Sequence, residues 1–238
     1  MANNDYKSIR VTRIYPNRCN VYFVQTAYGN ILIDSGQYRA FSRILQKLNR
    51  LLKQGEGIDY LILTHTHFDH SQNAVRLSKQ FGCKLICSLK ETDNTKKGVT
   101  SLPEGTGFFS KAIIKSARGM NNTRFSFPAF RADILVDNEF IPDQYEGNVR
   151  IISTPGHTKG SLSVILNNEV ALVGDTLFGI FPGYIFPPFA NDIPQMIKSW
   201  KKLLDTQAYV FLPGHGHAVK RRTLKKNYLK YSQKFKLN

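Results

Sequence analysis

Three of the six histidines in this 238-residue chain fall within six consecutive residues, directly after an apolar run over residues 60–63 that predicts a short buried strand. His65 and His67 are two residues apart, so on an extended segment their imidazoles project to the same side. Asp69 and His70 follow where a helix is predicted to begin, and they can face a second point nearby. Imidazole and carboxylate ligands together suit Zn²⁺, Fe or Mn and disfavour Ca²⁺. The pattern therefore predicts a metal site at the end of a buried strand.

Three further candidate ligands, His157, Asp175 and His215, each follow another predicted strand far along the chain. Each lies beside a glycine, and a tight turn at a strand end can point a ligand into a shared cleft. A single histidine is more often a hydrogen-bonded structural residue. That interpretation fails for the set, because five of the six histidines follow predicted strands. Seven His and Asp ligands are a natural supply for two metal ions, with Zn²⁺ favoured over Fe or Mn.

Apolar runs typical of strands alternate with longer amphipathic runs typical of helices along the chain. The first three strand-like runs are successive and predict an antiparallel meander, and a similar series of elements recurs in the second half. This order predicts two αβ halves packed through their sheets. Strands are predicted over residues 9–15, 20–25, 30–33, 60–63, 84–87, 134–136, 149–153, 161–166, 170–173 and 209–212, and helices over 41–53, 73–81, 193–204 and 223–235.

The length allows one large domain or two small ones, and we expect a single domain over residues 1–238. Residues 91–131 are rich in glycine and proline and have little sustained periodicity, so we expect an insertion or lid there, with a short helix near 111–116. Residues 220–236 carry eight Lys and Arg and no acidic residue, which predicts a basic C-terminal helix. Such a helix is usually a solvated face, and a phosphate-binding strip is the alternative.

Charge is the unusual bulk property of the chain. Thirty-three Lys and Arg against 17 Asp and Glu give a formal net charge of +16, which attracts anionic substrates and polyanions. We favour a basic surface over specific nucleic-acid binding, because charge alone carries little specificity.

The cysteines and the apolar runs indicate a cytoplasmic protein. Cys19, Cys83 and Cys87 are too few and too scattered for a disulfide framework, which favours a reducing compartment. No apolar stretch approaches 18 residues, so no transmembrane segment is expected, and the first ten residues contain no signal-peptide core.

The histidine and aspartate motifs, in this order and spacing, resemble the metallo-β-lactamase superfamily over roughly residues 9–217. Neighbouring segments resemble family patterns too, namely residues 31–36 (ILIDSG), 155–161 (PGHTKGS) and 174–178 (GDTLF). The resemblance implies an α/β fold, an αββα sandwich of two mixed sheets with the site at one edge of the sheets. It implies that His65, His67 and His157 hold one metal, that Asp69, His70 and His215 hold the second, and that Asp175 bridges them.

The sequence departs from the motifs of several branches of the superfamily, which narrows the range of activities to expect. Asp175 stands where zinc β-lactamases carry Cys or Ser, and Phe178 stands where quorum-signal lactonases place a tyrosine. Thr66 replaces the third histidine that is usual in the glyoxalase II type. The resemblance to that type covers its core without its C-terminal helical domain. Flavodiiron oxidoreductases need a flavodoxin domain, for which the chain has no counterpart. We therefore expect a compact metallo-hydrolase.

The resemblance implies a mechanism in which two cations lower the pKa of a shared water and the resulting metal-bridged hydroxide attacks an electrophilic centre. Asp69 and Asp175 are the expected catalytic residues, Asp175 as the bridge and Asp69 as a ligand that also orients the nucleophile. Asp34, Thr158 and Ser161 are candidates for supporting hydrogen bonds, although Asp34 could equally cap the following helix. His217 lies outside the pattern and is assigned a structural or substrate-side role.

The substrate is expected to be a small molecule, anionic and with an apolar part. The apolar segment 178–189 is held open by glycine and proline, and it is either a substrate-side loop or a loop packed under the insertion. We favour hydrolysis of a small ester, thioester or lactone. The alternatives are a nuclease-like phosphodiesterase, suggested by the charge, and a mononuclear-iron persulfide dioxygenase, since such members share these ligands.

Overall fold

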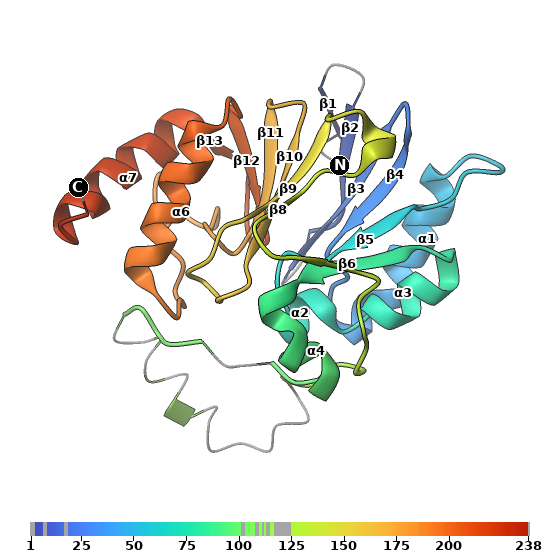
Figure 1. Cartoon of the computed structure of the whole chain (residues 1–238), viewed down its shortest axis with the longest axis horizontal. Coiled ribbons are helices and arrows are strands. Elements are labelled where there is room, and N and C mark those ends of the chain that lie inside the picture. Colours follow the sequence, from blue (N-terminus) through green and yellow to red (C-terminus); the bar gives the residue numbers. More distant parts are fainter. Residues whose placement is uncertain are drawn as a thin grey trace.

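Two sheets packed face to face form the centre of the molecule (Figure 1). The structure, a computed structural model, describes residues 3–6, 9–16, 19–100, 103–107, 110, 112, 115–116 and 125–237. One sheet has seven strands in the order β1 (Asn3–Tyr6), β2 (Ile9–Pro16), β3 (Asn20–Thr26), β4 (Gly29–Ile33), β5 (Tyr60–Ile62), β6 (Lys84–Ser88) and β7 (Ile134–Val136). The other has six, in the order β13 (Val219–Lys220), β12 (Val210–Pro213), β11 (Val170–Gly174), β10 (Leu162–Leu166), β9 (Val149–Ser153) and β8 (Glu139–Phe140).

Both sheets are mixed. Strands β1 to β4 pair antiparallel, which confirms the predicted meander, whereas β4 to β7 pair parallel. In the second sheet only β11 and β12 pair parallel. Asn167 and Asn168 form the two-residue turn between β10 and β11, with φ of 50° and 55°, the positive values that such a turn requires.

Helices cover the outer face of each sheet, which confirms the predicted αββα sandwich (Figure 1). Helices α1 and α3 pack on the seven-stranded sheet, and α6 and α7 pack on the six-stranded sheet. The helices that the described residues form are α1 (Phe41–Leu51), α2 (Phe68–Ser71), α3 (Ala74–Phe81), α4 (Thr92–Lys97), α6 (Ile193–Asp205) and α7 (Arg221–Lys234), with 3₁₀ turns at Tyr38–Ala40, Leu89–Glu91 and Asp143–Tyr145.

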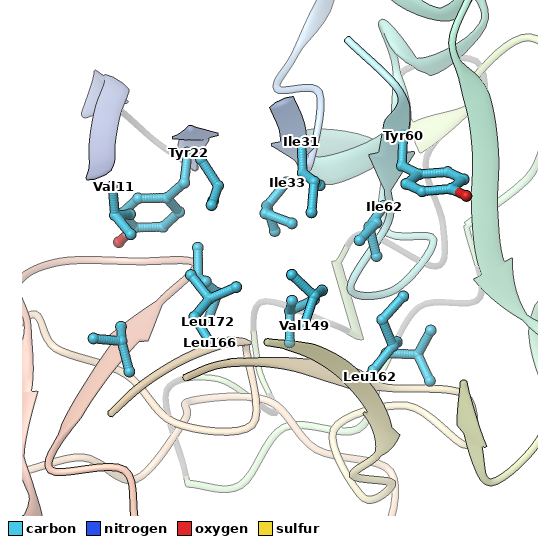
Figure 2. Packing of buried hydrophobic residues seen from close by; sticks show 14 of the residues in the cluster. Val11, Tyr22, Ile31, Ile33, Tyr60, Ile62, Val149, Leu162, Leu166 and Leu172 are labelled. Atoms are coloured by element: carbon cyan, nitrogen blue, oxygen red, sulfur yellow. The ribbon is translucent and has the colours of Figure 1, made fainter. Parts of the chain in front are cut away.

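The period of two along each strand divides its apolar side chains between two layers of core. In β3, Tyr22 and Val24 face the other sheet, whereas Val21 and Phe23 face the helix layer. Figure 2 shows the central layer, where Ile33 of the first sheet lies opposite residues of the second. This double-sided burial explains why the central strands are almost continuously apolar.

The segment predicted to be an irregular insertion begins with regular structure. The 3₁₀ turn Leu89–Glu91 leads directly into α4, which ends at Gly98 with φ of 64°. The helix expected near 111–116 lies mostly outside the described residues. Among the described residues, no helix is both long and apolar enough to cross a membrane.

Candidate metal centre

The structure brings all seven predicted ligands to one edge of the two sheets. His65 and His67 lie in the loop after β5, and α2 carries Asp69 and His70. The other three come from the second sheet and follow the ends of β9, β11 and β12; they are His157, Asp175 and His215. Since β4 and β5 run parallel, and β11 and β12 do too, their carboxyl ends meet at the same edge.

Four of these residues form a first cluster, which we call the three-histidine group: His65, His67, His157 and Asp175. Their potential ligand atoms all lie within 4.8 Å of one another, and all four residues are buried. The Nε2 of His157 lies 3.0 Å from the Nδ1 of His67 and 3.5 Å from Oδ2 of Asp175. The Nε2 of His65 lies 3.9 Å from the same Oδ2.

Asp69, His70 and His215 form a second cluster, which we call the Asp69 group. The Nε2 of His215 lies 3.5 Å from Oδ2 of Asp69 and 3.3 Å from Oδ2 of Asp175. The Nε2 of His70 lies 3.4 Å from the other oxygen of Asp175, Oδ1. Asp175 therefore faces both clusters, with one carboxylate between them.

The potential ligand atoms are arranged to bind a metal ion, because several of them have no hydrogen-bond partner. Although His65 Nε2, His70 Nε2 and Asp175 Oδ1 are buried, none of them has a hydrogen-bond partner, and an unsatisfied buried polar atom is costly. Two ligands bound at 2.0–2.1 Å in a tetrahedral arrangement lie about 3.4 Å apart. The measured separations of 3.0 to 3.9 Å bracket that value.

Hydrogen bonds to the opposite ring nitrogens direct lone pairs into the centre. His70 Nδ1 donates to Oδ2 of Asp34 (2.8 Å), and His157 Nδ1 donates to the carbonyl of Phe189 (2.9 Å). His65 Nδ1 lies 3.1 Å from the Thr64 hydroxyl, which itself donates to Asp34. In each case Nε2 is left as the acceptor that a cation needs.

Asp34 supports the site and does not cap a helix. Its Oδ1 accepts from the backbone N–H of Thr64 at 2.8 Å, and its carboxylate also accepts from the Thr64 hydroxyl and from His70. Its φ is 60°, a left-handed conformation that costs energy for a residue other than glycine. The structure therefore decides between the two roles that the sequence left open.

Burial and neighbouring charges lower the pKa values of two histidines at the centre and raise those of two others. Burial, followed by the neighbouring histidines, holds the pKa of His65 well below its usual value, and burial lowers the pKa of His157 to about 4. For His70, burial is outweighed by Cys19 and Asp34, and its pKa lies well above the usual value. For His215, burial is outweighed by Asp175, which raises its pKa.

Asp175 is ionised in this environment. Burial disfavours its charged form, but the imidazoles of His215 and His70 outweigh burial and hold its pKa well below the usual value. A carboxylate that is charged and buried between two histidine clusters is suited to bind cations.

The other predicted supporting residues form a turn beside His157. The backbone N–H of Thr158 donates to the Ser161 hydroxyl at 3.0 Å, and the two hydroxyls lie 3.1 Å apart. His217 is exposed and belongs to none of the ligand clusters found among the described residues. Its backbone N–H donates to the carbonyl of Gly179, which ties together two loops at the rim.

Two neighbours of the centre carried no signal in the sequence. The thiol of Cys19 lies 3.4 Å from His70 Nδ1, on the side away from the ligand atom. Glu91 is buried and accepts a hydrogen bond from Thr66, the residue between His65 and His67. Neither belongs to a recognisable motif, because each reaches the site only through the packing of the folded chain.

Comparison with known proteins agrees with this geometry. The sequence profile of the metallo-beta-lactamase superfamily matches residues 14–215. The chain belongs to the metallo-beta-lactamase superfamily. It is an enzyme of the metallo-hydrolase type.

Individual relatives extend the similarity over most of the chain. A probable metallo-hydrolase of Methanocaldococcus jannaschii is 31% identical over 191 residues, which are 79% of this chain and 82% of the relative. A hydroxyacylglutathione hydrolase of Brucella ovis is 28% identical over 137 residues, which are 57% of this chain and 40% of that protein. An archaeal superfamily protein of Sulfolobus tokodaii has the same fold, with a TM-score of 0.64, 21% identity, and coverage of 95% of this chain and 86% of that one.

Proposed function

We propose that the seven side chains hold two divalent cations and that the enzyme hydrolyses a small ester, thioester or lactone. The observation that carries the proposal is the shared carboxylate of Asp175, which faces both clusters while its Oδ1 has no hydrogen-bond partner. The three-histidine group would hold one cation through imidazole nitrogens, and the Asp69 group would hold the other. Three nitrogens and one carboxylate oxygen favour Zn²⁺ over Fe or Mn in the first group.

Hydrogen bonds within the protein orient the histidine ligands of both proposed sites. Divalent cations, when bound, supply Lewis acidity that activates water and stabilises negative charge on a substrate oxygen. Asp34 fixes the proton of His70 on Nδ1, and the carbonyl of Phe189 does the same for His157. Asp69, the least buried of the carboxylates at the centre, would orient the attacking water.

An apolar cavity beside the centre supports a substrate with an apolar part. The ring of Phe178 stacks on His215 with 4.7 Å between centroids, so it belongs to both the cavity and the metal centre. The cavity has a volume of about 250 Å³, whereas a cavity of about 150 Å³ accepts benzene. Its other lining residues include Thr106, Ile180 and Tyr184.

Segments from two parts of the chain form the cavity wall. Thr106, from the predicted lid, donates through its backbone N–H to the carbonyl of Pro188 (2.9 Å) and through its hydroxyl to that of Pro187 (2.7 Å). Most of the remaining wall belongs to the loop 178–189, whose Gly183 carbonyl accepts from Asn227 of α7 at 3.0 Å. We propose that the part of the predicted lid around Thr106 covers the substrate and that α7 supports the loop.

The cysteines support a cytoplasmic location for this enzyme. Cys19, Cys83 and Cys87 are free and buried, as is typical of proteins in a reducing compartment.

Phosphodiester hydrolysis at the same metals is the second candidate, and the net charge of +16 favours it. Helix α7 presents exposed cations in its middle and at its end, including Lys225, Lys226, Lys230 and Lys234. We rank this candidate second, because the cavity beside His215 is apolar whereas a phosphodiester is charged.

A hydrolase panel on the parent enzyme and on Asp175→Asn tests the proposal. Esters, thioesters, lactones and phosphodiesters are assayed with Zn²⁺ supplied. We expect turnover of acyl substrates in the parent and a loss of about 100-fold or more in Asp175→Asn, with circular dichroism unchanged. Asp205→Asn, an exposed carboxylate on α6, is the matched control and should keep parent activity. Turnover confined to phosphodiesters would favour the second candidate, and an active Asp175→Asn would contradict the assignment of that residue.

A further inference from the structure

Glu91 is a buried carboxylate for which the proposed chemistry has no use. Its side chain is 1% exposed at the end of the 3₁₀ turn Leu89–Glu91. None of the ion pairs among the described residues includes it, and its Oε1 has no hydrogen-bond partner. Burying a carboxylate without a cation costs free energy, so the contacts that it does make need an explanation.

On one side, Glu91 holds the loop that carries two of the histidines. Its Oε2 accepts from the hydroxyl of Thr66 and from the Nδ2 of Asn94, the latter at 2.8 Å. Thr66 lies between His65 and His67, so its side-chain contact acts on both ligands through the shortest possible stretch of backbone. The hydroxyl of Thr100 also donates to the Thr66 carbonyl, at 3.3 Å.

On the other side, Glu91 packs against the turn that follows the third histidine. A β-carbon at Gly160 would lie only 2.9 Å from Oε1 of Glu91 and 3.0 Å from its Cδ, so the carboxylate lies directly on this backbone. Gly160 donates to the Thr158 hydroxyl at 3.3 Å, within the turn that follows His157. One side chain therefore contacts both loops that supply the three histidines of this group.

We propose that Glu91 is a positioning residue that sets the distance between the His65/His67 loop and the His157 loop, and so sets the metal affinity of the three-histidine group. This inference rests on the proposed metal binding and goes beyond it, because Glu91 touches no ligand atom. The Asp69 group has no contact with Glu91 and should not respond. Supporting residues of this kind usually change metal affinity by about 10- to 100-fold when removed.

Three substitutions distinguish the effect of the hydrogen bonds and packing of Glu91 from the effect of its charge. Glu91→Ala removes the acceptor of both hydrogen bonds, and Thr66→Val removes the donor while keeping the volume. We expect each to weaken Zn²⁺ binding to the three-histidine group by about 10-fold or more. Glu91→Gln keeps an acceptor oxygen and the packing on Gly160, so its affinity should stay within about threefold of the parent.

The measurement is a Zn²⁺ titration of the metal-free protein in competition with a chromophoric chelator. A His215→Ala background reports the three-histidine group alone, and a His157→Ala background reports the Asp69 group. Asp59→Ala is the matched control, because it removes a carboxylate that accepts from Asn30 N–H and Tyr145 at the other end of β5. It should lower the thermal unfolding temperature without changing Zn²⁺ affinity.

The outcomes distinguish this inference from the proposed function. A selective loss in Glu91→Ala and Thr66→Val, with Glu91→Gln near the parent, supports positioning. Unchanged affinity in folded Thr66→Val overturns it, and so does equal weakening of both metal groups or a Glu91→Gln as defective as Glu91→Ala. If Glu91→Ala does not fold, Thr66→Val decides. A parent protein that binds no Zn²⁺ in either background would instead overturn the proposed function.

Discussion

An alanine at Gly214 is expected to damage the metal centre without unfolding the protein. Gly214 lies between the end of β12 and His215. A β-carbon there would lie 2.6 Å from Cε1 of His70 and closer still to Oδ1 of Asp175. Ordinary van der Waals contact begins near 3.4 Å, so the histidine must give way by about 0.8 Å.

The size of the effect follows from that displacement. Gly214 has no left-handed φ, so the substitution adds crowding and no backbone strain. Crowding in a packed interior costs about 1–3 kcal/mol of stability, which a domain of this size tolerates. A misplacement of about 1 Å in a catalytic site can reduce activity about 100-fold. We therefore expect a fall in kcat/KM of that order, together with weaker Zn²⁺ binding by the Asp69 group.

The assay compares Gly214→Ala with Gly57→Ala for hydrolysis of an acyl ester and for Zn²⁺ affinity. A β-carbon at Gly57 meets nothing within 4 Å, and its φ is ordinary, so this control should behave as the parent. If Gly214→Ala matches Gly57→Ala in both measurements, the close approach of β12 to His70 and Asp175 has no functional consequence and the reasoning fails.

Three further predictions follow from the same structure. As pH falls from 7 toward 4, the Zn²⁺ affinity of the Asp69 group should fall steeply, because the pKa values of His70 and His215 are raised and each must lose a proton to bind. The three-histidine group should keep its affinity to lower pH, since the pKa of His157 is about 4. Chelator competition at several pH values measures both affinities. Trp200→Ala should destabilise the metal-free protein by about 3–5 kcal/mol in urea unfolding, because the ring is fully buried and its Nε1 donates to the Thr176 carbonyl at 2.6 Å. A decrease of less than about 1 kcal/mol in the free energy of unfolding would contradict this packing. Ile180→Asp should raise KM for a long-chain acyl ester about 10-fold and leave KM for an acetyl ester unchanged, because the substitution removes part of the apolar cavity wall. Equal effects on both esters would show that the cavity does not hold the acyl chain.

The fold could be predicted where hydrophobic periodicity runs over many residues. Residues 20–25 were predicted as a strand, and the period of two then separates Tyr22 and Val24 from Val21 and Phe23, as the two core layers show. Helix α6 (Ile193–Asp205) was predicted to within one residue, because its buried positions recur at helical spacing. In the structure Asp192 caps its first turn. Strand β13, of two residues, and the short helix α4 were missed, because neither is long enough to display a period.

The candidate ligands could be found from the sequence because they follow strands, and the ends of neighbouring strands meet in space. The role of Asp34 was left open between supporting the site and capping a helix, and Glu91 was not predicted at all. Asp34 supports His70 across 36 residues, and Glu91 bonds Thr66 across 25, so each contact exists only once β4, β5 and β6 have paired in the seven-stranded sheet. Cys19 reaches His70 in the same way, across 51 residues.

The metal content of the protein, purified without chelators and analysed by mass spectrometry, tests the central claim most directly. If two clusters share Asp175 as described, the parent should carry about two divalent metal ions per chain, and Asp175→Asn should carry fewer. Two equivalents of zinc would agree with hydrolysis, and one equivalent of iron accompanied by oxygen consumption would point to a persulfide dioxygenase. A protein that binds no metal at neutral pH would contradict the account.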